Sequence, residues 1–95
     1  MDYHMKNKKY SKAQFSEDLK RLLALAEEVK LPFIGSDPKT YRVTFEDRDL
    51  GLVINIYCSQ MTVCFGGKRW PMGGYLYGQS WENITDIFHN LYRYI

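Results

Sequence analysis

The sequence predicts an α+β domain of two layers: a helix, an antiparallel meander of three to four strands, and a second helix. Three observations predict this class. Apolar residues recur every three or four positions near both ends of the chain, which is the period of an amphipathic helix. Between these segments apolar and polar residues alternate, as they do in half-buried strands. The longest apolar, β-branched run, residues 52–58, lies between two strand candidates and is expected to be a central strand.

Length and composition indicate one small globular domain. The chain has 95 residues, of which 45% are hydrophobic and 25% charged, and a chain of this length forms a single core. No apolar run approaches the roughly 20 residues of a bilayer-spanning helix, so no membrane association is expected. Residues 1–10 are rich in lysine and lack apolar periodicity, which predicts a mobile basic arm before a domain of residues 11–95. Because no hydrophobic segment follows the lysines, we expect no secretory signal and a cytoplasmic location.

The first helix is predicted at residues 12–30. Ser11 and Gln14 have the spacing of a capping box, in which each side chain satisfies a backbone donor at the helix start. Pro32 ends the helix, because the residue before a proline disfavours helical backbone angles. Residues 35–39 are typical of a turn. The apolar stripe of this helix consists of Phe15, Leu19, Leu22, Leu23, Ala26 and Val29.

Four strands are predicted, at residues 41–46, 52–58, 61–65 and 68–72. The strands can be paired so that every inward-facing side chain lies opposite another inward-facing one. In this pairing Phe45 is opposite Leu52, and Cys58 is opposite Val63. A shift by one residue would expose the inward side chains, at about 1.5 to 3 kcal/mol for each large one. In this register Cys58 points into the core, and Cys64 lies on the outer side opposite Tyr57. We therefore expect no disulfide between the two cysteines.

Glycines shape the end of the predicted sheet. Gly66 and Gly67 are adjacent, which favours a tight hairpin turn. The returning strand, 68–72, would bring Trp70 beside Val63. Pro71 has no backbone donor for a further strand, so this strand should form a sheet edge. Residues 75–78 are predicted to form a brief extended segment, for which the sequence does not indicate a pairing strand.

The last helix is predicted to begin after Ser80 and to run to the chain end. Ser80 is a good N-cap, and Glu82 lies in the first turn, where the helix dipole favours a negative charge. The apolar stripe of this helix consists of Trp81, Ile84, Ile87, Phe88, Leu91 and Ile95.

No catalytic, metal-binding or cofactor motif is recognised, so neither enzymatic activity nor a cofactor is predicted. The two cysteines and two histidines lack the spacing of zinc ligands. Asp86 precedes His89 by three residues on the last helix, which predicts a surface pair rather than acid–base catalysis. Asp47 and Asp49 are expected in an acidic hairpin turn, because the glycine and distal glutamate of a calcium loop are absent.

The leading hypothesis is a small non-enzymatic binding protein, an adaptor or inhibitor of the kind found among accessory proteins of phages and mobile elements. Eight tyrosines in 95 residues favour contacts with proteins, because tyrosine provides a large contact area with little entropy to lose. The outer side of the central strand is too apolar for an ordinary solvated face, which suggests that the arm, a second copy or a partner covers it. The candidate contact residues are Arg42, Val53, Asn55, Tyr57, Lys68, Arg69, Tyr75 and Tyr77.

The alternative hypothesis is nucleic-acid binding through the lysine arm and the Lys68 and Arg69 hairpin. The order helix, meander, helix resembles that of double-stranded-RNA-binding domains, and this resemblance is one of topology. In such domains basic residues at the start of the second helix contact phosphates. Here that turn reads Ser-Trp-Glu-Asn at residues 80–83, and Glu82 would repel a phosphate.

Overall fold

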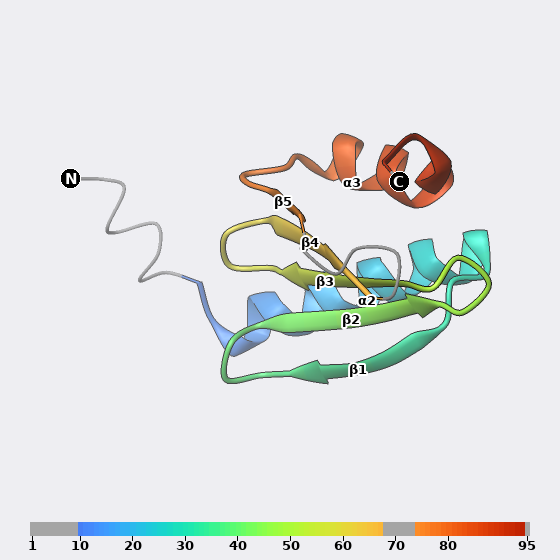
Figure 1. Cartoon of the computed structure of the whole chain (residues 1–95). Helices are drawn as coiled ribbons and strands as arrows, with labels where there is room; N and C mark the ends of the chain where they lie inside the picture. The colour runs from blue at the N-terminus through green and yellow to red at the C-terminus, as the bar shows by residue number, and fades with distance from the viewer. Residues whose placement is uncertain (1–9, 68–73, 95) are drawn as a thin grey trace.

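The structure is a computed structural model that describes residues 10–67 and 74–94. In this part of the chain a helix, an antiparallel sheet of five strands and a second helix follow in the predicted order (Figure 1). The predicted α+β class is therefore confirmed, with one strand more than expected. The elements are α2 (Lys12–Val29), β1 (Phe33–Asp37), β2 (Arg42–Asp47), β3 (Leu52–Tyr57), β4 (Thr62–Gly66), β5 (Gly74–Leu76), α3 (Trp81–His89) and the 3₁₀ helix η1 (Leu91–Tyr94).

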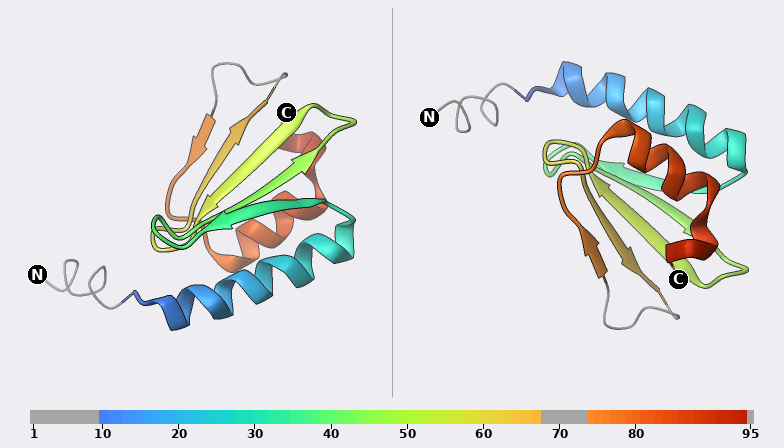
Figure 2. Two further views of the ribbon diagram at one scale, coloured as in Figure 1. Left: turned by 90° about the horizontal axis from the view of Figure 1, so that it is seen from below. Right: turned by 90° about the horizontal axis from the view of Figure 1, so that it is seen from above.

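The five strands lie side by side in chain order, and each neighbouring pair is antiparallel. The predicted central strand is β3, in the middle of this meander. Helices α2 and α3 pack against one face of the sheet, and neither lies over the opposite face (Figure 2). We call the helix-covered side the inner face and the opposite side the outer face.

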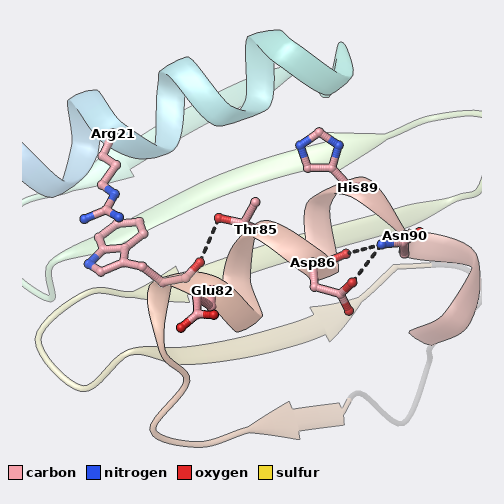
Figure 3. A pocket seen from close by; sticks show the side chains of 7 residues that line it. Arg21, Glu82, Thr85, Asp86, His89 and Asn90 are labelled. Carbon is pink, nitrogen blue, oxygen red and sulfur yellow. Dashed lines mark hydrogen bonds between the residues drawn. The ribbon is translucent and has the colours of Figure 1, made fainter.

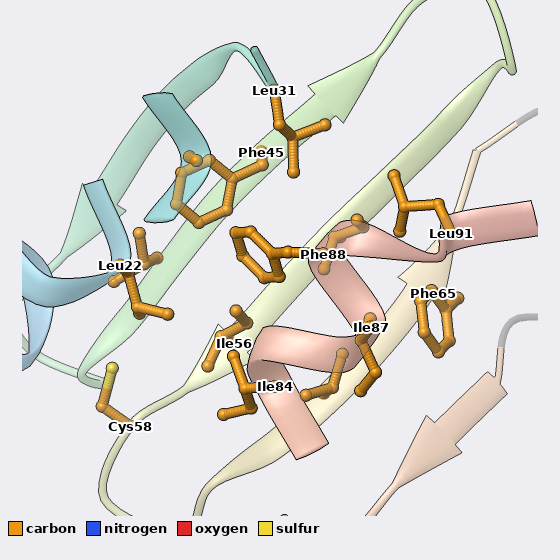
Figure 4. Close-up of a cluster of buried hydrophobic side chains, with 14 of the residues drawn as sticks. Leu22, Leu31, Phe45, Ile56, Cys58, Phe65, Ile84, Ile87, Phe88 and Leu91 are labelled. Carbon is orange, nitrogen blue, oxygen red and sulfur yellow. The ribbon is translucent and has the colours of Figure 1, made fainter. Parts of the chain in front are cut away.

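The core lies between the helices and the inner face. Alternation along β2 and β3 buries every second residue, and the residues between them stay partly exposed. A fully buried large apolar side chain contributes about 1.5 to 3 kcal/mol, so the stability of the fold rests on this face. Figure 4 shows Leu22 of α2 and Ile84, Ile87 and Phe88 of α3 packed against Phe45, Ile56 and Phe65 of the sheet.

Helix α2 begins and ends close to the predicted residues. The hydroxyl of Ser11 accepts a hydrogen bond from the backbone N–H of Gln14 at 3.2 Å, which is half of the predicted capping box. The Gln14 amide points elsewhere and donates to Asp18 at 3.1 Å. At the other end Lys30 adopts a left-handed conformation, and its N–H donates to the carbonyls of Ala26 and Glu27, which closes the helix.

The last helix ends earlier than predicted. Helix α3 stops at His89, and the chain continues after Asn90 as the 3₁₀ turn η1 instead of running on as α-helix. Asn90 leaves the helical backbone region, with φ −132° and ψ 47°. This change of direction brings the Tyr94 ring onto Phe65, with centroids 6.2 Å apart. Leu91 is still buried in the core, whereas Ile95 lies outside the described residues.

The predicted pairing of β2 with β3 was wrong by two residues, although the faces were right. Phe45 lies opposite Ile54, and Asp47 opposite Leu52. The turn has the expected four residues, but it lies at 48–51, one residue later than expected, and this displacement shifts the pairing by two. The Asp47 carboxylate accepts the backbone N–H of Leu50 at 3.0 Å, and Gly51 takes a positive φ of 64°. The acidic turn predicted here is thus a hairpin turn closed by Asp47.

The predicted pairing of β3 with β4 was also wrong by two residues. Val63 lies opposite Ile56 rather than Cys58. Cys58 has left this ladder, because its N–H donates to the carbonyl of Tyr41 at 2.8 Å. Met61, at the end of the turn, has a positive φ of 50°, a conformation that is uncommon for residues other than glycine. In the observed register Cys64 is opposite Asn55 and not Tyr57.

Strand β1 was not predicted. Residues 35–37, assigned to a turn, pair with β2, and the turn follows at residues 38–41. A register shift between Phe33 and Gly35 interrupts the pairing. Such a bulge breaks the alternation of apolar and polar residues by which strands are recognised.

The predicted strand at 68–72, with Trp70 and Pro71, lies outside the described residues. The neighbour of β4 is β5, and Val63 pairs with Leu76 instead of lying beside Trp70. Gly66 and Gly67 therefore do not form a two-residue hairpin. A Cβ added to Gly67 would lie 2.4 Å from the carbonyl oxygen of Gly51, so glycine is required here by close approach to the β2–β3 turn.

A polar cluster joins the start of α2 to the end of the sheet. The hydroxyl of Tyr10 donates to the buried carboxylate of Asp18 at 2.6 Å, and the Tyr10 ring contacts Tyr41 with centroids 4.8 Å apart. Burial and the bond to Asp18 raise the pKa of Tyr10. Burial, with a smaller contribution from the charge of Asp18, raises the pKa of the Cys58 thiol to about 12. Both groups are therefore protonated near neutral pH.

Alkylation of the native protein should separate the two thiols. Cys58 is buried and Cys64 is partly exposed, and the thiolate is the reactive form. At about pH 8 we expect a maleimide to label Cys64 at least about tenfold faster than Cys58, with the second adduct appearing only on unfolding. Intact-mass spectrometry of the protein and of a Cys64→Ser variant, which should take no label in its native state, provides the measurement. Equal labelling of both thiols would contradict the assignment of Cys58 to the core.

Replacement of Leu91 by alanine should destabilise the protein. Leu91 is 8% exposed and belongs to the core cluster, and truncating a buried leucine costs about 2 to 3 kcal/mol near the lower end of the measured range. Arg93→Ala, in the same 3₁₀ turn but exposed, serves as control and should stay within about 0.5 kcal/mol. Urea unfolding measures both. Equal midpoints for the two variants would show that η1 does not contribute to the core.

Candidate functional site

The outer face is the surface on which the predicted contact residues gather. Arg42, Val53, Asn55 and Tyr57 lie on it through the alternation of β2 and β3, and Tyr75 joins them from β5, opposite Cys64. Tyr77 lies against Tyr75 just beyond the strand. Lys68 and Arg69, the remaining predicted residues, lie outside the described part of the chain.

Small and polar side chains form the middle of the outer face. One row across the sheet runs through Gly35, Thr44, Asn55, Cys64 and Tyr75. The Thr44 hydroxyl donates to the side-chain oxygen of Asn55 at 2.6 Å. The side chains of Thr44, Asn55 and Cys64 are partly exposed, so the middle of the face consists of short polar groups in reach of solvent.

Arg42 places a cation on this face, in a second row between Asp37 and Tyr57. Its Nε atom is buried, yet among the described residues it makes no hydrogen bond. A buried donor without an acceptor costs about 1 to 3 kcal/mol. Because Nε is inaccessible in the free protein, a molecule bound to the outer face would reduce this cost only if the Arg42 side chain moved to meet its oxygen.

Two tyrosines stand out from the face at its β5 edge. Tyr75 is 60% exposed and Tyr77 is 72% exposed. Their rings are nearly parallel, with an interplanar angle of 8° and centroids 5.7 Å apart. Each ring restricts the other, so less side-chain freedom is lost when a partner contacts them.

The far end of the outer face is hollowed. Glu46 and Val53 of the face, together with Arg48, Gly51 and Gly67, line a depression of about 360 Å³ beside the β2–β3 turn. The Glu46 carboxylate lies 3.9 Å from Nε of Arg48. The outer face is therefore uneven. The rings of Tyr75 and Tyr77 project at its β5 edge, and a depression lies beside the β2–β3 turn.

A second hollow, of about 420 Å³, lies on the helical side of the molecule (Figure 3). Arg21 of α2 places its guanidinium carbon 4.1 Å from the centre of the Trp81 ring, a cation–π geometry. The sequence predicted Trp81 in the apolar stripe of the last helix, and it did not indicate a contact with Arg21. The other lining residues, all from α3 or its end, are Glu82, Thr85, Asp86, His89 and Asn90.

The polar groups of this interhelical hollow are engaged with each other. Asp86 accepts hydrogen bonds from the Tyr94 hydroxyl at 2.6 Å and from the Asn90 amide at 2.8 Å. The bond from Tyr94, followed by that from Asn90 and the charge of Arg93, lowers the pKa of Asp86. Asp86 is thus ionised at neutral pH and has the properties of a structural acceptor.

The predicted pair of Asp86 with His89 forms neither a hydrogen bond nor an ion pair within the described residues, although the charge of His89 makes a small contribution to the lowered pKa of Asp86. His89 Nε2 instead lies 2.9 Å from the carboxylate of Glu28, which joins α3 to α2. The prediction missed this contact because Glu28 and His89 are 61 residues apart. Ordinary helix spacing relates only residues three or four apart.

The third hollow, of about 370 Å³, is lined by the Tyr10 and Asp18 cluster, with Gln14, Cys58, Ser59, Met61 and Trp81. Its carboxylate is already bonded by Tyr10 and Gln14, and its thiol is protonated near neutral pH. The described residues contain no group of three His, Cys, Asp or Glu side chains arranged to hold a metal ion. Neither described α-helix has the length and apolar character of a membrane-spanning segment.

Comparisons with models of protein families, with curated protein sequences and with solved structures find no match to this chain.

Proposed function

We propose that the protein is a small non-enzymatic binding protein, an adaptor or inhibitor, that contacts another protein through the outer face of its sheet. The observation that supports this proposal most is the exposed, stacked pair Tyr75 and Tyr77 beside a face that neither helix covers. Large aromatic side chains contribute disproportionately to protein interfaces. Polar side chains around such an aromatic pair give orientation and specificity.

Arg42 provides a second, independent observation in favour of the outer face as the contact surface. Its buried Nε lacks an acceptor within the described residues, and the backbone carbonyls of a partner are suitable acceptors. A movement of the Arg42 side chain on binding would expose Nε, and the partner would then satisfy a donor that the free protein leaves unpaired. Asn55 and Thr44, which are bonded to each other, provide further polar groups near the centre.

The described surface favours a protein partner over nucleic acid. Asp37 and Glu46 share the outer face with Arg42, and these carboxylates would repel phosphates, whose contacts dominate nucleic-acid affinity. The cations on which the nucleic-acid hypothesis depends lie in residues 1–9 and 68–69, outside the described residues. Binding to nucleic acid is therefore an outcome that the capture experiment below must exclude.

Replacing Tyr57 and Tyr77 together with alanine should abolish partner capture. Truncation of aromatic residues at an interface typically costs about 2 kcal/mol or more, or about thirtyfold in affinity. Wild-type and variant proteins serve as baits in nuclease-treated lysate of the source cells, and bound proteins are quantified by mass spectrometry. Binding is then repeated with the purified partner.

The matched control for this capture experiment is Phe33→Ala. Phe33 is also an exposed aromatic residue, 44% exposed, but it lies on β1 at the opposite edge of the sheet. This variant should retain the partner. If the double variant still captures it with full affinity, the outer face is not the contact surface. If the protein captures partners from untreated lysate but none after nuclease treatment, the result would support nucleic-acid binding instead.

Arg42→Met should separate stability from binding. The methionine keeps the apolar stem and removes the unpaired buried donor, so the free energy of unfolding should stay unchanged or rise by up to about 1 kcal/mol. Affinity for the purified partner should fall, because the bond to Arg42 is lost. Urea unfolding and isothermal titration calorimetry measure the two quantities. A destabilised variant with unchanged affinity would assign Arg42 a purely structural role.

A further inference from the structure

We infer that the free edge of β5 binds a short extended segment of the partner as an additional antiparallel or parallel strand. This inference rests on the proposed function, of which it specifies the mode. Within the described residues β5 pairs with β4 on one side and with no strand on the other. It forms the outermost strand of the sheet (Figure 2). Alternate backbone N–H and C=O groups of an edge strand point away from the sheet and are available to a strand of another chain.

The two edges of the sheet differ in how they are protected. Strand β1 contains a bulge after Phe33, follows Pro32, ends at the charged Asp37 and is followed by Pro38. Bulges, prolines and charges are the devices by which proteins prevent edge pairing. Residues 74–80, in contrast, contain neither proline nor any charged residue, and the β4–β5 ladder has no register shift. The β5 edge is therefore the one that admits a further strand.

The β5 edge is held in place for binding. Beyond the strand, the N–H of Gln79 donates to the carbonyl of Met61 at 2.8 Å. The Gln79 side-chain amide donates back to the carbonyl of Tyr77 at 2.9 Å. Tyr75 and Tyr77 stack on each other. A preformed strand and preformed rings reduce the entropy lost on association.

The exposed area of the two tyrosines at the β5 edge indicates a peptide segment rather than a second copy of this chain. With about 200 Å² for each tyrosine side chain, Tyr75 and Tyr77 expose on the order of 250 Å² together. A stable dimer buries about 800 Å² on each subunit. The paired part of β5 has only three residues, which limits an added strand to a similar length. A short extended segment fits these dimensions.

The chemistry of the edge defines the segment. Because residues 74–80 carry no charge, the edge offers no ion-pair partner to a charged side chain of the added strand. Side chains that alternate in direction along the added strand would place every second one on the tyrosine rings. The segment is therefore uncharged and carries β-branched or aromatic residues at alternate positions.

The test uses a panel of acetylated, amidated heptapeptides in which threonine alternates with valine, isoleucine, tyrosine or phenylalanine. Binding is followed by chemical shifts and amide exchange of the ¹⁵N-labelled full chain. We expect at least one peptide to shift and protect the amides of Tyr75, Leu76 and Tyr77. The same peptide with N-methyl groups on alternate amides should bind at least about tenfold more weakly, because backbone hydrogen bonds are the basis of strand addition.

Two variants test the location. Tyr77→Lys places a charge on the β5 edge and should abolish the peptide-induced shifts, because lysine on an edge strand opposes pairing. Phe33→Lys makes the same change at the β1 edge and should leave peptide binding unaltered. The inference is overturned if no peptide of the panel protects β5, if N-methylation has no effect, or if Phe33→Lys alone abolishes binding.

The same reagents distinguish failure of the inference from failure of the proposed function. If Tyr57→Ala and Tyr77→Lys each abolish capture of the purified partner but no peptide protects β5, the outer face binds the partner and the β5 edge does not add a strand. Capture that survives both single variants contradicts both. Concentration-dependent protection of β5 without peptide, together with dimers in sedimentation velocity, would assign the edge to a second copy. Shifts produced by an oligothymidylate and not by peptides would assign it to nucleic acid.

Discussion

One-sided burial of the sheet is the constraint on which the rest of this structure depends. In the described part of this 95-residue chain, two α-helices cover a sheet of five strands, and both pack on the same face. Val43, Ile54, Ile56 and Val63 are completely buried by this arrangement. Since side chains alternate along a strand, the residues between these four must face the other way. The outer face is thus a direct consequence of how the core is built.

The same alternation explains which parts of the fold could be predicted from the sequence. The faces of β2, β3 and β4 were predicted correctly, yet both registers were wrong by two residues. A two-residue shift leaves every side chain on its own face, so the hydrophobic pattern cannot detect it. The turns set the register instead. Their geometry depends on the Asp47 carboxylate bond to Leu50 and on positive φ at Met61, which are local details that periodicity does not record.

Interruptions of periodicity account for the other differences. The bulge after Phe33 concealed β1, and Asn90 redirected a stripe of apolar residues that otherwise continues toward the chain end. Of the candidate site, the outer-face residues Arg42, Asn55 and Tyr57 followed from alternation alone. The stacking of Tyr75 on Tyr77 did not, because it requires the observed pairing of β5 with β4. The contacts of Arg21 with Trp81 and of Glu28 with His89 join separate helices, and no local pattern predicts them.

The polar groups of the molecule divide into two kinds, and this division separates structural from candidate contact residues. On the helical side, Asp18, Asp86 and His89 each have hydrogen-bond partners within the chain. These bonds join α2 to the segment before it, α3 to η1, and α3 to α2. On the outer face, Arg42 Nε is buried without an acceptor among the described residues, and two mostly exposed tyrosine rings stack on each other. Groups whose interactions are incomplete within the chain are those that an external molecule can complete, and here they lie on the face that the helices leave uncovered.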